Sequence, residues 1–140
     1  MAVPKRLVLD TDVIIEHLRG KTGPSLIGRL QDETALATTL INAFELYYGA
    51  YKSKNSRTNL ASVKGFLSTI TTLEFDEPSA ERSSQVLAQL ESKDLTVDSR
   101  DLLIGCISLA HGYPLLTLNR RHLERIPGLL VITPSDLKPQ

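Results

Sequence analysis

Short apolar runs alternate with longer amphipathic segments along this chain. The apolar runs predict strands because they are short and end at polar or turn-forming residues. The longer segments repeat apolar residues every three or four positions, which is typical of helices. This alternation predicts an α/β domain with a short, mainly parallel central sheet. The predicted strands are residues 7–9, 35–38, 71–75, 115–118 and 129–132, and the predicted helices are residues 13–19, 24–31, 40–54, 60–68, 79–93 and 98–111.

The length of 140 residues predicts one domain, since no linker or repeat divides the chain. Sixteen basic and sixteen acidic residues give a formal net charge of zero. This balance neither indicates nor excludes a nucleic-acid partner, because local patches set the field at a site. Cys106 is the single cysteine and is interpreted as a core residue. Without a recognisable signal peptide or a membrane-length apolar run, we expect a soluble, cytoplasmic protein with no membrane contact.

Several carboxylates stand where one pattern gives way to the next. Asp10 and Asp12 directly follow the apolar run 7–9, and Asp98 and Asp101 open a helix that is almost entirely apolar. Acids that border a core are costly unless they are paired, hydrogen-bonded or bound to a metal. Carboxylate oxygen is also the ligand that Mg²⁺ and Mn²⁺ prefer. In a parallel sheet, ligands bind beyond the carboxyl ends of the strands, where Asp10 lies.

Helix capping is the competing explanation for two of these acids. Asp12 precedes the apolar residues of the first helix, and we interpret it mainly as an N-cap. Capping explains Asp98 about as well as catalysis does, because Asp101 would then lie in the favourable first turn. Asp101 also begins a stripe of small and polar residues with Gly105 and Ser108 on an otherwise buried helix. We therefore favour a functional role for Asp10 and Asp101.

The segment 40–54 is predicted to form an amphipathic helix with one broad apolar face, with Glu45 at its edge. Asn42, Glu45 and Gly49 line up along this edge at helical spacing, and a glycine beside Glu45 would leave space for another group. Taken alone, Glu45 is better explained as a solvated residue on a helix rim. The predicted apolar face consists of Leu40, Ile41, Ala43, Phe44, Tyr47, Tyr48 and Tyr51.

Basic residues follow Asn119, which lies just beyond the predicted strand 115–118. Arg120, Arg121 and Arg125 stand close enough together in the sequence to hold the phosphates of RNA. A solvated helix start explains the same residues equally well. The three histidines show no zinc-binding spacing and are expected at the surface.

Four segments taken together resemble PIN-domain ribonucleases, and most closely the VapC-type toxins of prokaryotic toxin–antitoxin pairs. The resemblance implies a PIN-like three-layer α/β/α fold over residues 1–140, with the acids gathered at one end of the sheet. Each segment alone is a weak signal, but their order and spacing fit the family from one end of the chain to the other. The segments are residues 8–15, 42–49, 101–106 and 116–123.

The resemblance assigns catalytic roles to Asp10, Glu45 and Asp101, with Asn119 at a position where the family has a fourth acid or an Asn. Asp10 and Asp101 would bind Mg²⁺ or Mn²⁺ directly, and Glu45 would complete the shell or orient a water. A neutral Asn119 favours one firmly held metal over two. Thr117, which matches a family Thr, and Asp98 are given secondary roles. Asp12 and Asn42 also have secondary roles, and both depart from the family pattern. Asp12 replaces the usual Asn, and Asn42 replaces the usual Ser or Thr.

The function that this resemblance implies is metal-dependent cleavage of RNA by the toxin of a type II toxin–antitoxin pair. The implied partners are the RNA substrate, a VapB-like antitoxin and a second copy of the chain. Two alternatives remain open at this point. One is a catalytically weak PIN scaffold that binds RNA or protein. The other is a phosphatase similar to the haloacid dehalogenases, with Asp10 as its nucleophile.

Overall fold

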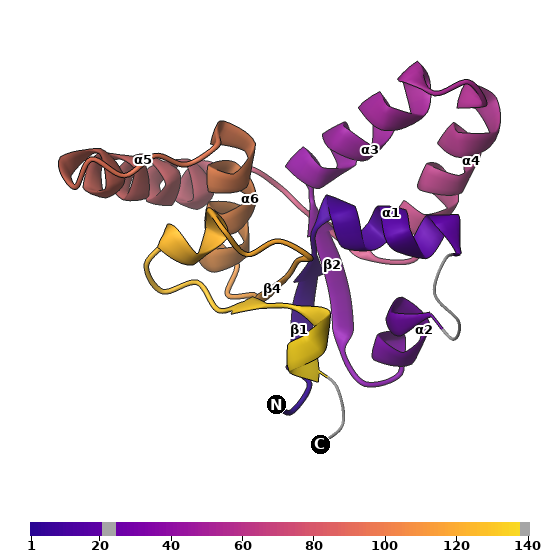
Figure 1. The fold of residues 1–140 in the computed structure, drawn as a ribbon, viewed down its shortest axis with the longest axis horizontal. Coiled ribbons are helices and arrows are strands. Elements are labelled where there is room, and N and C mark those ends of the chain that lie inside the picture. The colour runs from indigo at the N-terminus through magenta and orange to yellow at the C-terminus, as the bar shows by residue number, and fades with distance from the viewer. Residues whose placement is uncertain (21–24, 138–140) are drawn as a thin grey trace.

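The centre of the molecule is a five-stranded sheet whose described pairings are all parallel (Figure 1). The structure, a computed structural model, describes residues 1–20 and 25–137. The strand order is β3-β2-β1-β4-β5, which confirms the predicted α/β class. The strands are β1 (Arg6–Leu9), β2 (Ala35–Thr39), β3 (Thr71–Leu73), β4 (Leu115–Leu116) and β5 (Val131–Ile132).

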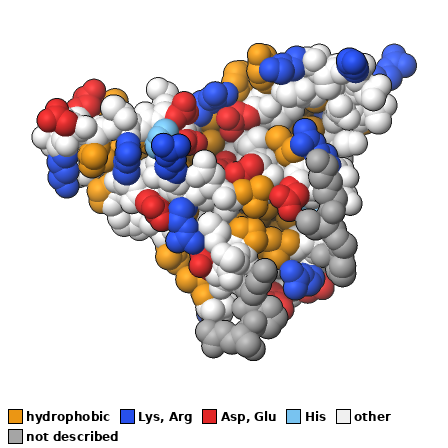
Figure 2. Space-filling model, viewed as in Figure 1, with side chains coloured by type: hydrophobic (Ala, Val, Ile, Leu, Met, Phe, Trp, Pro, Cys, Tyr) orange, Lys and Arg blue, Asp and Glu red, His pale blue; other side chains and the backbone are white. Residues whose placement is uncertain are grey.

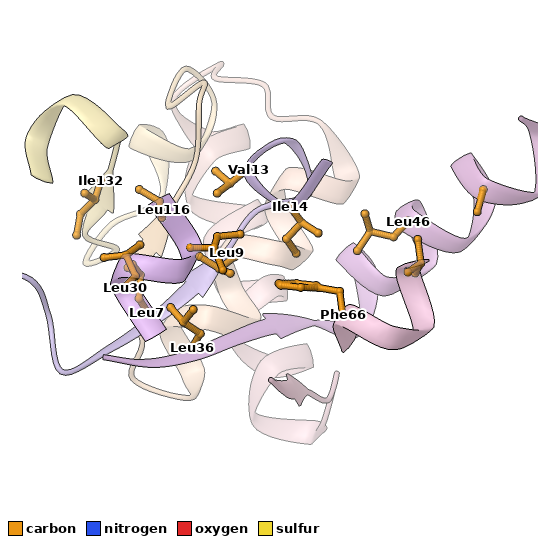
Figure 3. Close-up of a cluster of buried hydrophobic side chains, with 13 residues drawn as sticks. Leu7, Leu9, Val13, Ile14, Leu30, Leu36, Leu46, Phe66, Leu116 and Ile132 are labelled. Carbon is orange, nitrogen blue, oxygen red and sulfur yellow. The ribbon is translucent and has the colours of Figure 1, made fainter. Parts of the chain in front are cut away.

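Alternating side chains of β1 point into two separate hydrophobic clusters. Leu7 and Leu9 lie in one cluster and Val8 in the other, and all three side chains are fully buried. This is the pattern expected of a central parallel strand covered on both faces. Figure 3 shows the first cluster, in which Leu36 and Leu116 from the neighbouring strands lie beside the β1 leucines.

Helices cover both faces of the sheet, so the three-layer prediction is confirmed (Figure 1). Residues of α1, α2, α3 and α4 pack into the first cluster, while residues of α5, α6 and η1 pack into the second. The helices are α1 (Thr11–Arg19), α2 (Leu26–Gln31), α3 (Leu40–Lys52), α4 (Ser56–Leu67), α5 (Glu77–Ser92) and α6 (Ser99–Ala110), with short 3-10 turns η1 (Leu123–Arg125) and η2 (Pro134–Leu137).

Most predicted boundaries differ from the structure by a few residues. The helix predicted at 24–31 begins at Leu26 behind an N-cap at Ser25, and Pro24 lies outside the described residues. The helix predicted from residue 60 begins four residues earlier, at Ser56. The strand predicted at 115–118 ends at Leu116, because the backbone N–H of Leu118 turns away to bond a side chain of the site.

The apolar face predicted on α3 is only partly buried. The face that packs against α1 and α4 carries Ala43, Leu46 and Ala50, all of them buried. The other side of the helix carries large apolar side chains that water reaches, with Phe44 60% and Tyr51 65% exposed. No element of the described chain covers them, so periodicity identified the apolar positions but not which of them the monomer buries. We call the exposed set, Leu40, Phe44, Tyr48 and Tyr51, the α3 stripe.

Within the described ranges, 1–20 and 25–137, none of the helices has the length and apolar character needed to cross a membrane.

Gly105 and Gly49 offer a matched test of the packing. A Cβ atom on Gly105 would overlap Ile126 Cδ1 and lie 3.2 Å from Leu129 Cδ2, whereas one on Gly49 would meet nothing within 4 Å. We expect Gly105→Ala to lower the free energy of unfolding by about 1–2 kcal/mol through overpacking. Gly49→Ala should raise it by up to ~1 kcal/mol through helix propensity. Urea unfolding followed by circular dichroism measures both, and shifts of equal sign would contradict this packing.

Candidate active site

Asp10 lies at the junction between β1 and α1, at the carboxyl edge of the sheet. Its backbone N–H donates to Leu116 O at 2.9 Å, which holds the residue beside β4. Its Oδ1 accepts from the backbone N–H of Thr11 at 2.8 Å, so Asp10 is the N-cap of α1. The prediction that Asp12 caps this helix was therefore wrong. The strand runs into the helix without a loop, so the residue that ends the strand must also cap the first turn.

Side chains from two other elements fix the Asp10 carboxylate, which is 8% exposed. Asn42 Nδ2 donates to Oδ1 at 3.0 Å, and Thr117 Oγ1 donates to Oδ2 at 2.7 Å. Both donors are fully buried. Each oxygen of Asp10 thus has a fixed orientation before any ligand arrives.

Asn42 joins the start of α3 to the start of α1. Its Oδ1 accepts from the backbone N–H of Thr39 at 3.2 Å, and its own N–H donates to Thr39 Oγ1 at 3.2 Å, which completes a capping box. Its Nδ2 also donates to Thr11 Oγ1 at 2.9 Å, in addition to Asp10. An amide can cap the helix and still reach the acid, because it carries an acceptor and two donors. This accounts for an Asn where the family pattern has a Ser or Thr.

Glu45 lies one turn further along α3, on the same side as Asn42. Its Oε1 accepts from Thr11 Oγ1 at 2.6 Å, and its Oε2 lies 3.5 Å from Arg100 Nη1. Burial raises the pKa of Glu45, and the charges of Asp10 and Asp101 add to this, while Thr11 and Arg100 oppose it. Glu45 is therefore no solvated rim residue: it belongs to the same cluster as Asp10.

Asp12 reaches from the first turn of α1 to the end of β4. Its two carboxylate oxygens each lie 3.3 Å from the backbone nitrogen of Leu118, and Thr117 Oγ1 lies 3.4 Å from Oδ2. Burial, followed by the charge of Asp10, raises the pKa of Asp12 to about 6. Asp12 thus lies inside the acidic cluster, where the resemblance had given it a secondary role, and does not cap the helix.

Asp98 and Asp101 have different surroundings, as the sequence suggested. Asp98 caps α6, with its Oδ1 accepting from the N–H groups of Arg100 at 2.9 Å and Asp101 at 3.3 Å. Asp101 Oδ2 lies 3.5 Å from His122 Nδ1. Burial raises the pKa of Asp101, as do the charges of Asp10 and Asp98, and His122 opposes the rise. His122 was expected at the surface, and its side chain is 35% exposed, but its pairing with Asp101 was not predicted.

The small and polar stripe predicted to begin at Asp101 does not extend along α6 as a functional surface. Gly105 is buried against Ile126 and Leu129, and Ser108 donates to Ile104 O within its own helix at 2.8 Å. Gly105 makes room for the C-terminal segment, so only Asp101 belongs to the site.

Asn119 is positioned beside the cluster but its side chain turns elsewhere. Its backbone N–H donates to Thr117 Oγ1 at 3.2 Å, which links it to the hydroxyl that holds Asp10. Its Oδ1 accepts from the backbone N–H of Arg121 at 3.2 Å. A catalytic or metal-binding role for Asn119 stays a prediction, and it would require this side chain to rotate.

Two of the three arginines predicted to bind RNA are engaged within the chain. Arg120 Nη2 donates to Asp136 Oδ2 at 2.8 Å and holds η2 beside β5, while Arg125 donates to Thr96 O. Arg121 is exposed. A role of these residues in RNA binding stays a prediction, best suited to Arg121.

The negative charges of the clustered acids repel one another, and a bound cation would reduce this repulsion. Figure 2 shows acidic side chains gathered between the side of the molecule formed by α5 and α6 and the side formed by α3 and α4, with Lys and Arg side chains around them. Among residues 1–20 and 25–137, no three acid, His or Cys side chains lie close enough to hold one ion directly. A hydrated Mg²⁺ or Mn²⁺, contacting some carboxylates through its own waters, fits this all-oxygen donor set, because Mg²⁺ in proteins usually keeps several waters.

A pocket of about 230 Å³ opens beside Glu45, between α1, α3 and α4. Gly49 lines this pocket, and a Cβ atom on it would meet nothing within 4 Å. That the glycine leaves room for another group stays a prediction. The apolar lining consists of Ile15, Leu18, Leu46, Ala50 and Val63, and the polar lining includes Arg19, Glu45, Ser53, Asn59 and Ser62.

Comparison with known proteins places this geometry in a family. The family model of the PIN domain matches residues 7–129. The chain belongs to the PIN-domain family. Nucleases of this family generally depend on divalent metal ions. Asp10, Glu45 and Asp101 of this PIN domain all lie within the matched range.

Relatives with close to one third of identical residues span nearly the full length of this PIN domain. The tRNA(fMet)-specific endonuclease VapC of Salmonella typhimurium is 31% identical over 126 residues, which cover 90% of this chain and 96% of the relative. Ribonuclease VapC1 of Rickettsia felis is 30% identical over 134 residues, covering 93% and 97%.

Solved structures agree with this PIN fold. The DNA-bound VapBC of Salmonella typhimurium matches with a TM-score of 0.84 at 31% identity, covering 93% of this chain and 98% of that chain. A toxin–antitoxin complex from Klebsiella pneumoniae matches with a TM-score of 0.63 at 27% identity, covering 91% and 97%.

Sequence reasoning missed three contributors to the site. Thr11 bonds Glu45, Arg100 pairs with Glu45, and His122 pairs with Asp101. Thr11 and Arg100 each stand next to an acid that the sequence had singled out, and this adjacency was the available signal. His122 gave no such signal, because its contact depends on how the segment after β4 folds back onto α6.

The raised pKa of Asp12 predicts a pH dependence of stability. Because the folded pKa, about 6, exceeds the ordinary value of 3.8, the folded protein binds more protons than the unfolded chain between these values. Proton binding by Asp12 therefore stabilises the folded protein below pH ~4, and this stabilisation is lost as the pH rises through about 6. Without divalent metal, we expect Asp12→Asn to flatten this decline and to stabilise the fold at pH ~7 by about 1–2 kcal/mol, since Asp12 is partly exposed.

Urea unfolding in the presence of a chelator, repeated across this pH range, measures the effect. The exposed Asp94 provides the control, because Asn tolerates its positive φ of 56°. If Asp12→Asn and Asp94→Asn show the same pH profile as the wild type, the cluster does not destabilise the charged form of Asp12.

Proposed function

We propose that residues 1–140 form a single metal-dependent endoribonuclease domain, the VapC-type toxin of a type II toxin–antitoxin system. The observation that carries this proposal is the convergence of Asp10, Glu45 and Asp101 from three separate elements at the carboxyl edge of the sheet. The nuclease names of relatives that are aligned over about nine-tenths of the chain support it.

In this proposal Asp10, Glu45 and Asp101 hold Mg²⁺ or Mn²⁺, in part through the ion's own waters. When bound, the ion would supply a nucleophile at neutral pH and charge stabilisation at the phosphate. Asn42 and Thr117 keep the Asp10 carboxylate oriented, and Thr11 does the same for Glu45. Such preorganised oxygens do not have to reorient during the reaction.

The partners follow from the relatives. Two of the similar structures are described as VapBC and as a toxin–antitoxin complex, so we propose a VapB-like antitoxin as the protein partner of this chain. The Salmonella typhimurium relative is named for tRNA(fMet), which makes an initiator tRNA the first substrate to test. The expected cellular site of action is the cytoplasm.

The phosphatase alternative loses support because the family model that matches residues 7–129 is that of the PIN domain. The phosphatase chemistry would also leave Glu45 and its bond from Thr11 without a role. The scaffold alternative differs from the proposal only in activity, so a cleavage assay separates them.

Cleavage of a labelled initiator tRNA tests the proposed activity. We expect cleavage by the wild type with Mg²⁺ or Mn²⁺ and none with a chelator. Asp10→Asn, Glu45→Gln and Asp101→Asn should each lower the rate by at least ~10²-fold, because each removes a charge that holds the cation. Glu45→Gln can still accept from Thr11, so its loss of activity would not reflect misfolding.

Asp94→Asn is the matched control and should cleave like the wild type. Equal cleavage by all of these variants would rule out the metal-nuclease proposal. A wild type that cuts neither initiator tRNA nor a mixture of cellular RNAs with any divalent metal would support the binding scaffold instead.

We also propose that two copies of the chain associate through the α3 stripe. The stripe runs from Leu40 to Tyr51, about 16 Å along the helix. Phe44 and Tyr48 stack with nearly parallel rings, 6.3 Å apart at the centroids. Exposed aromatic and aliphatic side chains grouped in this way are typical of protein interfaces.

Tyr48→Glu should convert a dimer into a monomer at micromolar concentration, because a carboxylate would have to lose its water in the apolar interface. Size-exclusion chromatography with light scattering measures the mass. Thr58→Glu, at an exposed position of α4, is the control and should remain dimeric. A wild-type protein that is monomeric at ~100 μM would contradict the proposed association, for which interfaces normally reach micromolar affinity or better.

A further inference from the structure

Arg100 places a guanidinium group inside the acidic cluster. It lies in the first turn of α6, between the capping residue Asp98 and Asp101. Its Nη1 lies 3.5 Å from Glu45 Oε2, and its Nε lies 4.0 Å from Asp98 Oδ1. Arg100 thus reaches across from α6 to α3, the two helices that carry Asp101 and Glu45.

Arg100 has a special electrostatic position. Within residues 1–20 and 25–137, it is the only Lys or Arg that forms an ion pair with Asp10, Asp12, Glu45 or Asp101. Four carboxylates at one edge would repel the phosphates of an approaching RNA strand. A cation at the same edge is therefore needed to bring a phosphate close to them.

The ion pair between Arg100 and Glu45 is weak enough for Arg100 to leave Glu45 and bind another anion. Its separation of 3.5 Å exceeds the 2.7–2.9 Å of a strong charge-assisted bond, and the Arg100 side chain is 56% exposed. Such exposed pairs contribute about 1 kcal/mol or less. Glu45 does not depend on Arg100 for its position, because Thr11 holds its other oxygen at 2.6 Å.

A divalent cation held by Glu45 would compete with Arg100 for the charge of this carboxylate. A cation that takes this carboxylate leaves the guanidinium without its partner, at the edge of the site and still largely exposed. A free guanidinium binds phosphate through two parallel hydrogen bonds, which gives it orientation as well as charge.

We propose that Arg100 is the phosphate anchor of this nuclease, resting on Glu45 in the free protein and transferring to a phosphate of the RNA strand when a cation binds Glu45. The proposal rests on the proposed ribonuclease function. It makes Arg100 a positioning residue, with two effects of opposite sign. Removing its charge should weaken RNA binding and strengthen cation binding, whereas loss of a merely structural residue would weaken both.

Three variants test this. Arg100→Gln removes the charge but keeps the backbone N–H that Asp98 caps. Arg100→Lys keeps the charge but loses the planar guanidinium group and its two parallel hydrogen bonds. Arg29→Gln, at an exposed position of α2, is the matched control. Isothermal titration with Mn²⁺ in the absence of RNA measures cation affinity, which should rise about 3–5-fold in Arg100→Gln and stay unchanged in Arg29→Gln.

RNA binding is measured without turnover, in an Asp101→Asn background, with a labelled single-stranded oligoribonucleotide. Mn²⁺ is kept at a concentration that isothermal titration shows to saturate the weakened site of this background. We expect Arg100→Gln to weaken binding about 10-fold and to reduce the slope of log K against log salt by about 0.7, the value for one phosphate contact. Arg100→Lys should retain part of the affinity and the full salt slope. Arg29→Gln in the same background should match its parent.

The proposal is overturned if Arg100→Gln leaves RNA affinity and salt slope at the level of Arg29→Gln, or if its Mn²⁺ and RNA affinities fall together. These results are separable from failure of the proposed activity. A wild type that cleaves RNA while Arg100→Gln binds it normally refutes the anchor alone. A wild type that cleaves nothing, with RNA affinity still dependent on Arg100, refutes the nuclease activity and retains the anchor.

Discussion

The bond from the Asn42 amide to the Asp10 carboxylate is the interaction on which the site depends. It joins the two places where a strand of the sheet passes directly into a helix, β1 into α1 and β2 into α3. Through the same amide, Thr11 is placed to hold Glu45. Because the bond is buried, loss of either partner would remove a hydrogen bond that water cannot readily replace. The position of the acids is therefore tied to the integrity of the fold.

The site concentrates negative charge where the carboxylates are only partly exposed to solvent. Asp12, Glu45 and Asp101 all have raised pKa values, for which burial is the first cause and neighbouring acids a further one. This arrangement costs stability in the absence of a cation, and such costs are typical of functional sites. Arg100 and His122 offset part of the charge, each from the surface side of the cluster. The result is a site prepared for a cation and for an anionic substrate that the cation can hold.

Much of the fold could be predicted from local pattern, and the errors have specific physical causes. Alternation of short apolar runs with helical segments led to the parallel sheet, since a buried parallel strand needs apolar residues on both faces, as in Leu7, Val8 and Leu9. The assignment of Asp12 as a cap failed because the strand and helix share Asp10 without a loop. The extent of burial on α3 was not predicted, because periodicity marks apolar positions and does not say whether the same chain covers them. Arg100 and His122 reach acids from distant parts of the sequence, and no local rule predicts such a pairing.

The amino-acid sequence by itself determined the order of strands and helices, the resemblance to PIN-domain ribonucleases, and the choice of Asp10, Glu45 and Asp101 as candidate catalytic acids. These depend on residue type and spacing, which the chain carries locally. Only the tertiary structure decided that Asp10 caps α1, that Asp12 belongs to the acidic cluster, that Asn119 turns its side chain away, and that Arg100 lies on Glu45. The contacts of Asp12 and Arg100 join atoms far apart in sequence, so they depend on how the strands and helices pack together. The contacts of Asp10 and Asn119 are local, but they depend on where each strand ends and how the backbone then turns.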